Sequence, residues 1–473
     1  MTSSTSNSTN AKSSTLRAIP SVDQLLHTDV AARLRPAIGL PRLTAIAREV
    51  TEEMRAGAQA GGLVEDSKEA LLALAAKRLN EVSLVEKLAR LRRVINATGV
   101  IVHTNLGRAP LSEAARNAVE QASRYCTLEY DPATGSRGKR GQRTEELLTQ
   151  LTGAEAALVV NNCASAALLI LTVLAGDGET ILSRGELVEI GGDFRVPDVM
   201  ANSGTLMVEV GTTNRTSLED YSKALNARTR LIMKVHPSNY RIVGFTAAPQ
   251  LSELAALAHS AGLYLYEDAG SGVLDDLSAY GISDEPIIRE SVSAGVDVVS
   301  FSGDKLLGAT QAGLIVGRRE IIDRLRKHSL YRALRVDKLC LAALEATLEA
   351  HRRKAIEEIP VLHMLSLSAD AIEERAKKLI SKLLKNTIGL ISATIVAGES
   401  AIGGGSGPNV HPATALIALK HEKLKADDLE EKLRLSSSPV IARISDGLVL
   451  LDLRTVAPAE EPELLDAVLA LEN

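Results

Sequence analysis

Short apolar runs alternate with longer amphipathic stretches through the middle of the chain, beginning near residue 144. Such runs are typical of buried strands, and apolar residues recurring every three or four positions are typical of helices. The expected strands are residues 158–160, 180–183, 206–210, 231–235, 263–266 and 296–300. The expected helices between them are residues 164–175, 251–261 and 285–294. This alternation predicts an α/β fold with a mostly parallel sheet covered by helices on both faces.

The two ends of the chain carry different patterns. Residues 20–93 show helical spacing alone, interrupted at Gly61-Gly62, which predicts a helical N-terminal domain. After the sheet region, helices at 337–358, 369–384 and 426–433 and strands at 391–396, 440–444 and 448–452 predict a smaller C-terminal α/β domain. The expected organisation is a disordered tail (1–17), a helical domain (18–93), a large domain with its lead-in segment (94–336), and a linking helix with the small domain (337–473).

Composition excludes several classes of protein. The 473 residues are 45% hydrophobic and 24% charged, as in ordinary globular proteins, but only 2% aromatic, so stacking on many nucleobases is not the expected task. No apolar run is long enough to span a bilayer. Cys126, Cys163 and Cys340 form no Cys-x-x-Cys pair, so neither a disulfide framework nor a metal site is expected. The expected location is the cytoplasm.

Charge is spread unevenly along the chain. The net charge is −5, yet residues 1–98 hold 14 Lys and Arg against 10 Asp and Glu, or +4. The remaining residues hold 40 against 49, or −9. A modestly basic N-terminal domain fits local binding to a polyanion, although a solvated helical surface explains the same charges.

Two polar side chains follow two of the expected strands. Lys305 comes shortly after the apolar run 296–299, and Asp268 follows the run 263–266. Because active sites of parallel sheets gather at the carboxyl ends of the strands, both are expected at one edge. A lysine amine can form a Schiff base with pyridoxal phosphate, and a carboxylate can keep the cofactor's ring nitrogen protonated. Taken singly, a lysine at a strand end is usually solvated and an Asp-Ala-Gly segment is usually just a turn.

A third strand end offers a place for the cofactor phosphate. Asn162, Ala164 and Ser165 lie where the strand 158–160 gives way to the next helix. Free backbone N–H groups and the helix dipole favour an anion there, although ordinary N-capping explains the same residues. Cys163 in this turn has no partner base and is interpreted as a small filler.

Two further residues are candidate cofactor contacts. His236 follows the strand 231–235 and is placed to lie over the cofactor ring, while a lone His is more often structural. Ser302 belongs to the small-residue strand end before Lys305. We expect both to bind the cofactor.

Two glycine-rich segments remain. The run 403–408 (GGGSGP) lacks the Lys-Ser pair and the helix start of a P-loop, so a flexible turn is favoured over a phosphate cradle. The run 135–141 (GSRGKRG) is a basic loop that would reach a cofactor or an acceptor stem.

Six strings in a fixed order make the chain similar to a known family. They are 96–99 (NATG), 103–110 (HTNLGRAP), 183–192 (SRGELVEIGG), 209–216 (EVGTTNRT), 301–308 (FSGDKLLG) and 331–339 (YRALRVDKL). Together they resemble bacterial selenocysteine synthase, the L-seryl-tRNA(Sec) selenium transferase family. The resemblance runs from about residue 18 to 360 and continues more loosely through 403–406.

The resemblance implies a fold-type I pyridoxal phosphate enzyme that converts L-seryl-tRNA(Sec) to L-selenocysteinyl-tRNA(Sec). Lys305 would form the internal aldimine and shuttle protons, Asp268 would hold the pyridinium proton, and Asp304 would be a further active-site residue. Loss of water from the serine would give an aminoacrylyl intermediate, and selenophosphate would supply the selenium.

The resemblance also implies substrate contacts and partners. Arg108, Arg332 and Arg335 match the family's arginines for the donor phosphate, which a guanidinium group binds bidentately. If helical, Arg332 and Arg335 share one face. The N-terminal domain would grip seryl-tRNA(Sec), and the subunits would form a homo-oligomer, a ring of dimers with active sites between subunits.

The chain departs from the family pattern at Cys163, at Ala309-Thr310 and at Glu267-Asp268-Ala269. These departures touch the expected pocket walls and leave the expected catalytic groups in place. They bear on the substrate more than on the cofactor.

Two other functions suit parts of the sequence. A pyridoxal phosphate lyase acting on a small phosphorylated amino sugar or amino acid would use the same cofactor and arginines, but it has no need of the N-terminal domain. A non-enzymatic tRNA-binding protein would have no reason to keep Lys305, Asp268 and a phosphate turn at three strand ends.

Overall fold

The computed structural model describes residues 16–60, 67–190 and 194–472. The chain forms two compact units, which we call the N-terminal unit (residues 1–93) and the main unit (residues 94–473). The expected disordered tail lies outside the described residues except for Leu16 and Arg17, which are helical. The expected helix break at Gly61-Gly62 also lies outside them.

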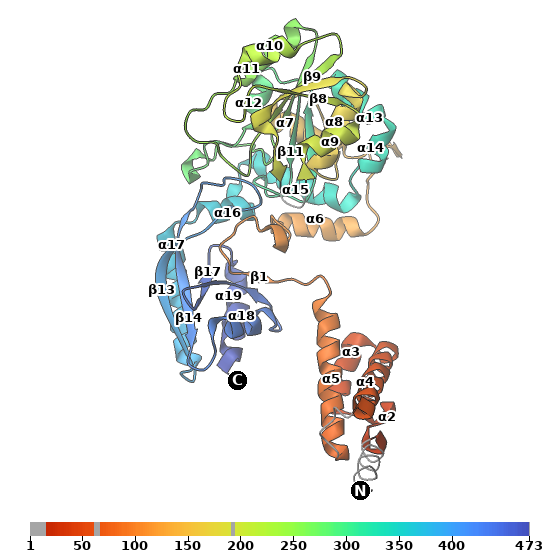
Figure 1. The fold of residues 1–473 in the computed structure, drawn as a ribbon, viewed down its shortest axis with the longest axis vertical. Helices are drawn as coiled ribbons and strands as arrows, with labels where there is room; N and C mark the ends of the chain where they lie inside the picture. Colours follow the sequence, from red (N-terminus) through yellow and green to blue (C-terminus); the bar gives the residue numbers. More distant parts are fainter. Residues whose placement is uncertain (1–15, 61–66, 191–193, 473) are drawn as a thin grey trace, which may run out of the picture. The chain divides into compact units, whose positions relative to one another are not determined.

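The described part of the N-terminal unit is helical (Figure 1). Its helices are α2 (Val22–Leu26), α3 (Asp29–Ile38), α4 (Leu40–Ala60) and α5 (Lys68–Leu88). Helix α2 begins after Ser21, whose hydroxyl accepts a hydrogen bond from the Gln24 N–H in a capping box. Apolar side chains at three and four spacing, such as Leu43, Ile46 and Leu71, make a buried core shared by these helices.

A seven-stranded sheet forms the centre of the main unit. Its strand order is β4 (Ala156–Val160), β12 (Gly313–Gly317), β11 (Val298–Ser302), β10 (Tyr264–Asp268), β9 (Thr229–Val235), β5 (Glu179–Ser183) and β8 (Leu206–Val210). Strand β12 is antiparallel to both of its neighbours, and the other pairs are parallel. The expected α/β fold with a mostly parallel sheet is confirmed, while β12 was not expected from its three apolar residues between two glycines.

Helices cover both faces of this sheet (Figure 1). On one face lie α8 (Cys163–Ala175), α9 (Val196–Ser203), α13 (Arg319–Lys327) and α14 (Ser329–Leu334). On the other face lie α7 (Gln142–Thr152), α11 (Leu251–Ser260), α12 (Ile288–Ser293) and α15 (Lys338–Arg353). Each group encloses its own apolar core, because alternate residues of buried strands point to opposite faces.

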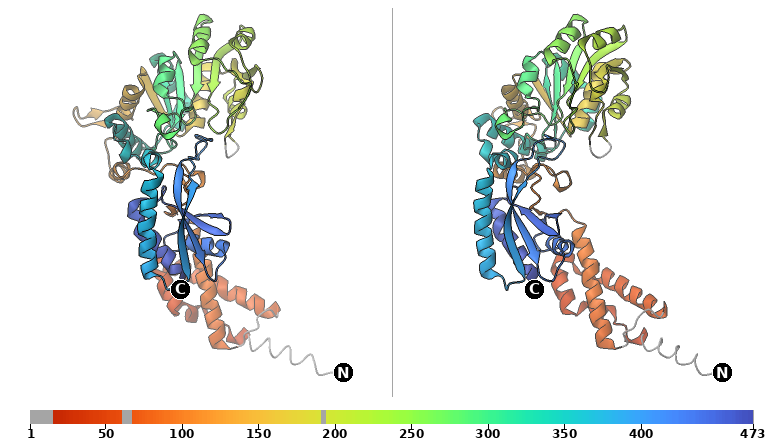
Figure 2. Two further views of the ribbon diagram at one scale, coloured as in Figure 1. Left: turned by 90° about the vertical axis from the view of Figure 1, so that its left-hand side faces the viewer. Right: turned by 60° about the vertical axis from the view of Figure 1, so that its left-hand side comes forward.

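A second, four-stranded sheet follows in the chain. Its order is β13 (Ile391–Glu399), β14 (Ala413–His421), β17 (Leu448–Asp452) and β16 (Arg443–Ser445), all antiparallel. Helices α17 (Ala369–Asn386), α18 (Ala426–Arg434) and α19 (Glu461–Leu469) contribute to its core. Figure 2 shows α17 lying along the sheet.

The boundary expected between residues 93 and 94 is also the boundary between the two units. Within the main unit, two segments pack against a different sheet from the one expected. The lead-in strand β1 (Ile95–Asn96) pairs with β15 (Val440–Ile441), so it belongs with the small sheet. Helix α15 buries Leu341, Leu344 and Leu348 in the core of the large sheet. The expected strand 440–444 is divided between β15 and β16.

Arg454 ties the small sheet to the segment that follows β13. It is 1% exposed, and its guanidinium donates to the Ser400 hydroxyl and to the carbonyls of Met364, Leu367 and Ala413 at 2.7–2.9 Å. Asp452, fully buried, accepts from Ser400 Oγ at 2.7 Å. A buried charge needs such partners. Arg454 and Asp452 together fix the backbone at Ser400, three residues before the glycine-rich turn 403–408.

Within the described parts of the chain, no helix is long and apolar enough to cross a membrane.

Candidate active site

Asp268 and Lys305 meet at one edge of the large sheet, as their strand-end positions predict. Asp268 is the last residue of β10, and Lys305 lies in the turn that follows β11, the parallel neighbour of β10. Asp268 is 5% and Lys305 6% exposed. Both are therefore held at the carboxyl end of the strands rather than solvated.

Three donors converge on one oxygen of Asp268. Its Oδ1 accepts from the Cys163 thiol at 3.3 Å, from Ser300 Oγ at 3.1 Å and from the Gly270 N–H at 3.3 Å. Among the described residues, no group donates to Oδ2. Burial raises the pKa of Asp268 above its ordinary value, while these hydrogen bonds and the nearby Lys305 charge lower it. These three bonds orient the carboxylate through Oδ1 and leave Oδ2 available to a cationic group.

Register explains how Ser300 reaches Asp268. The two residues are paired across β10 and β11, so their side chains point to the same face. Tyr266 lies on that face too, and its hydroxyl is 2.8 Å from Ser300 Oγ. Since Ser300 Oγ donates to Asp268, Tyr266 is left to donate to Ser300. Burial raises the pKa of Tyr266 well above its ordinary value, which keeps this hydroxyl protonated as a donor.

Sequence reasoning missed Cys163, Ser300 and Tyr266. Cys163 was interpreted as a filler, and the other two as strand residues. The thiol instead supports Asp268, and burial raises its pKa well above the ordinary value, so it acts as a donor and not as a thiolate nucleophile. The alternation of Tyr266 with Asp268 along β10 was the one available signal.

The turn that carries Lys305 is held from behind by helix α15. His351, 2% exposed, has Nε2 2.9 Å from the carbonyl oxygen of Leu307, so this nitrogen carries the proton that it donates. The Gly308 N–H closes the turn on the Lys305 carbonyl at 2.9 Å. His351 therefore positions the turn that carries Lys305. It lies in α15, which was expected only as a linking helix.

The residues expected to hold a phosphate open helix α8. Asn162 is its N-cap, and its Oδ1 accepts from the Ser165 N–H at 2.8 Å. No described group accepts from the N–H groups of Cys163 and Ala164, which remain available to an anion. A Cβ at Gly313 would collide with the carbonyl oxygen of Asn162, so β12 can pass this turn only with glycine there.

Asp304, next to Lys305, is bonded on both oxygens. Its Oδ2 accepts from the guanidinium of Arg108 at 2.7 Å, and its Oδ1 accepts from Ser302 Oγ at 2.8 Å. Asp304 is 4% exposed, while the side chain of Arg108 is 31% exposed, so only the carboxylate side of this ion pair is shielded from water. The hydroxyl of Ser302 serves Asp304, and contact between Ser302 and the cofactor stays a prediction.

His236 lies at the end of β9 beside Asp268. Its backbone N–H donates to the Asp268 carbonyl at 2.9 Å, and its Nε2 is 3.4 Å from Glu285. Burial alone would raise the pKa of Glu285, but the neighbouring His236 and the hydrogen bonds from Ser271 and the Gly407 N–H lower it overall. His236 thus sits against a buried carboxylate, and its place over the cofactor ring stays a prediction.

Arg332 and Arg335 do not share a helix face. Helix α14 ends at Leu334, and Arg335 is extended (φ −67°, ψ 142°). The Leu334 carbonyl accepts from the Asn161 N–H at 2.9 Å, which places this chain end beside the start of α8. Arg332 is exposed and Arg335 half-buried beside Arg140 and Tyr331. The structure brings Arg108, and not these two, to Asp304.

These groups fit pyridoxal phosphate. The open Oδ2 of buried Asp268 suits a protonated ring nitrogen, the buried amine of Lys305 suits a Schiff base, and the free N–H groups at the start of α8 suit a phosphate. On a mostly parallel sheet with one antiparallel strand beside β11, they define a fold-type I pyridoxal-phosphate-dependent enzyme.

Comparisons with known proteins show to which family within this class of enzymes the chain belongs. The family model described as L-seryl-tRNA selenium transferase matches residues 94–457, and the model described as selenocysteine synthase N terminal matches residues 16–55. The chain belongs to the L-seryl-tRNA selenium transferase family. The L-seryl-tRNA(Sec) selenium transferase of Geobacter sulfurreducens is 47% identical over 95% of this chain and 98% of its own length. That of Moorella thermoacetica is 47% identical over 97% of each chain.

A solved structure supports the fold. D-Glucosaminate-6-phosphate ammonia-lyase has a TM-score of 0.55 and 23% identity, and the match covers 82% of this chain and 98% of that one. At this identity the likeness concerns the fold alone.

Proposed function

We propose that this protein converts L-seryl-tRNA(Sec) to L-selenocysteinyl-tRNA(Sec), with pyridoxal phosphate as cofactor and selenophosphate as selenium donor. The observation that carries the proposal is the identity of 47% over nearly the full length of selenium transferases. The buried pair of Lys305 and Asp268 supplies the chemical groups that such a reaction needs.

Each residue of the site has a separate role in the proposed reaction. When bound, pyridoxal phosphate supplies an electron sink that makes the serine α-proton acidic. The N–H groups at the start of α8 would hold its phosphate, and Asp268 Oδ2 would hold the proton of its ring nitrogen. Lys305 takes the α-proton at Nζ and delivers a proton to the departing β-hydroxyl, which leaves as water. Asp304, fixed by Arg108 and Ser302, keeps the lysine turn in place.

The reaction balances without an oxidant. Serine loses its α-proton and β-hydroxyl as one water, and selenium forms the new bond to the β-carbon. One water is consumed when the phosphorus–selenium bond of the donor is cleaved to phosphate. The hydroxyl of that water goes to phosphorus. Lys305, neutral once water has left, takes up a proton from the incoming selenium donor and passes it to the α-carbon, and the water's proton is left on selenium.

We assign the donor phosphate to arginines. Arg108 lies within the site through its bond to Asp304, and Arg335 follows the residue that contacts the start of α8. Guanidinium groups bind phosphate bidentately. Arg332 belongs to the same segment and is exposed, so it is free to meet a ligand or a second subunit.

The N-terminal unit is assigned to tRNA binding. Arg33, Arg35, Arg48 and Arg55 are exposed on α3 and α4, and none forms an ion pair with another described residue. Unpaired arginines attract a phosphate backbone. We also assign the protein to the cytoplasm and to a homo-oligomer, a ring of dimers, which sedimentation of the purified protein tests: a monomer at working concentration would contradict it.

The direct test is selenium transfer. Purified protein with seryl-tRNA(Sec) and selenophosphate should form selenocysteinyl-tRNA(Sec) and phosphate. The alternative is a lyase acting on a small phosphorylated amino sugar or amino acid. Release of ammonia from such a compound, without product from the tRNA, would favour that alternative.

Removing residues 1–90 should abolish tRNA binding and leave the cofactor bound, because the main unit contains every proposed cofactor ligand. The measurement is a filter-binding titration with labelled tRNA beside a visible absorption spectrum. Full tRNA affinity in the shortened protein would move the binding site into the main unit.

Replacing Arg332 and Arg335 together by alanine should raise the donor concentration needed for half-maximal rate by about 10-fold or more, since each charged hydrogen bond contributes about 1.5–3 kcal/mol. Cofactor absorption should be unchanged. The exposed pair Arg319 and Arg324 on α13, replaced in the same way, is the control. An unaltered donor requirement would exclude the two arginines as phosphate ligands.

A further inference from the structure

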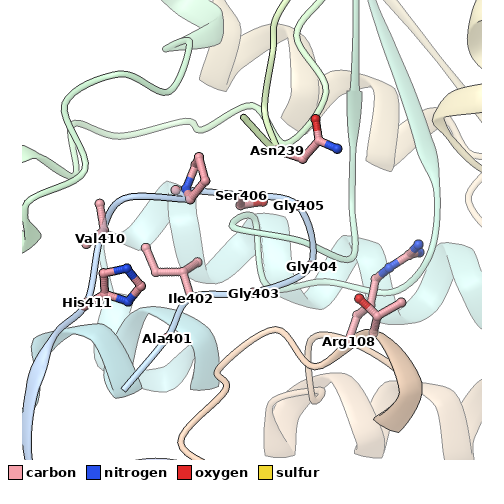
Figure 3. Close-up of a pocket in the computed structure, with 13 residues that line it drawn as sticks. Arg108, Asn239, Ala401, Ile402, Gly403, Gly404, Gly405, Ser406, Val410 and His411 are labelled. Carbon is pink, nitrogen blue, oxygen red and sulfur yellow. The ribbon is translucent and has the colours of Figure 1, made fainter. Parts of the chain in front are cut away.

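A pocket of about 410 Å³ adjoins the catalytic turn in the main unit (Figure 3). Its walls come from the glycine-rich turn 403–407, from Pro408, Val410 and His411 on one side, and from Thr104, Arg108 and Asn239 on the other. Arg108 also bonds Asp304, the neighbour of Lys305. The pocket therefore shares a wall with the active site without being formed by the residues proposed to hold the cofactor.

The run 403–408 forms a turn, as expected, and close contacts define the shape of its backbone. Gly403 and Gly404 have φ of 78° and 64°, and a Cβ at either would lie 2.5 Å from a methyl group of Val100 or Val102. The Gly407 N–H donates to the buried Glu285 at 2.9 Å. Only glycine permits this backbone so close to the lead-in segment, so the concavity is built into the fold.

Several polar groups on the pocket wall lack a partner. Ser406 is 2% exposed, and its hydroxyl has no hydrogen bond to any described group. The same holds for Asn239 Oδ1 and Arg108 Nε, which are buried. No described group accepts from the N–H groups of Gly404 and Gly405. Buried polar atoms without partners are costly, so this set points to a polar ligand with donors and acceptors.

Size and wall chemistry decide between ligands. A cavity of this volume is in the range of organic ligands of about 300–1,000 Å³ and is far larger than a phosphate group needs. One wall, with Ile402, Pro408, Val410 and the His411 ring, suits a flat base. The other wall, with the free N–H groups of Gly404 and Gly405, suits a phosphate.

We infer that this pocket binds the 3′-terminal nucleotide of the aminoacylated tRNA. The inference rests on the proposed function, since the serine is then esterified to the terminal ribose. Three bonds separate the serine Cα from that ribose, so the terminal nucleotide must lie next to Lys305. The pocket beside Arg108 and Asp304 is in that place.

The test compares two tRNA(Sec) transcripts that differ only in the 3′-terminal adenosine. The full-length holoenzyme should bind the complete transcript at least about 10-fold more tightly, as expected for charged hydrogen bonds to one phosphate. Ser406→Ala should reduce this preference by about 2- to 10-fold, the effect of one neutral hydrogen bond. Thr104→Glu, which adds a negative charge to the pocket wall where the nucleotide's phosphate would lie, should reduce it at least as much.

Asn105→Glu is the control, because it puts the same charge on an exposed neighbour that does not line the pocket. It should keep the preference. Affinity for the shortened transcript serves as the folding control for every variant.

Equal affinity of the wild-type protein for both transcripts would overturn the inference, and so would an unchanged preference in both test variants. If Ser406→Ala and Thr104→Glu instead weaken only the binding of inorganic phosphate, the pocket belongs to the selenium donor. Selenium transfer is measured in parallel. If selenium transfer occurs but the protein shows no preference for the terminal adenosine, the assignment of the pocket is wrong and the proposed function stands. If the preference is present but no selenium is transferred, the proposed function is wrong.

Discussion

Replacing Lys305 by alanine is expected to abolish the visible absorption of the covalently held cofactor and to lower selenium transfer by at least about 10³-fold. The amine has two tasks, anchoring the cofactor and moving protons, and general acid–base catalysis alone contributes about 10²–10⁴-fold. Lys305 is 6% exposed, and no second lysine lies in the turn after β11. The measurement is an absorption spectrum followed by a transfer assay.

Lys432→Ala is the matched control, because this lysine is exposed on α18 in the small domain. It should keep both the absorption and the activity. A Lys305→Ala protein that retained the absorption band would show that another amine holds the cofactor, and the assignment of the site would be wrong.

Replacing Asp268 by asparagine is expected to lower the turnover by about 10²–10³-fold, the usual effect of losing one electrostatic contact to the reacting system. Asparagine keeps the size of the side chain but not the negative charge that holds the ring proton. Cys163 and Ser300 would still contact the amide, so the cofactor should remain bound. Steady-state rates beside cofactor content per subunit measure both effects.

Glu267→Gln is the control for this change. Glu267 is the preceding residue of β10, is 3% exposed, and points to the opposite face of the sheet. The Glu267→Gln variant should keep a turnover within a few fold of the wild-type value. If Asp268→Asn had no larger effect than Glu267→Gln, the carboxylate would not be acting on the cofactor.

Periodicity in the sequence was enough to predict the α/β fold and the meeting of Asp268 with Lys305. Both follow from local patterns, since a buried strand is recognised by its own residues and its end by the polar residues after it. The Cys163 and Ser300 contacts were not predictable in the same way. They depend on the register of β10 against β11 and on where α8 begins, which are set by partners distant in sequence.

Two further features of the site depend on contacts with residues distant in the chain. Arg332 and Arg335 were expected to share a face if helical, but the Leu334 carbonyl bonds to Asn161 and the helix stops there. The run 403–408 was expected to be a flexible turn. Its shape comes from Glu285, Val100 and Val102, all far away in the chain.

The most direct measurement for the whole account is the visible spectrum of the purified holoenzyme before and after addition of seryl-tRNA(Sec). The account predicts that the charged tRNA shifts the band of the lysine-held cofactor, because the serine amine replaces Lys305, and that uncharged tRNA and free serine do not. A band that ignores seryl-tRNA(Sec) but shifts with a phosphorylated amino sugar would contradict it.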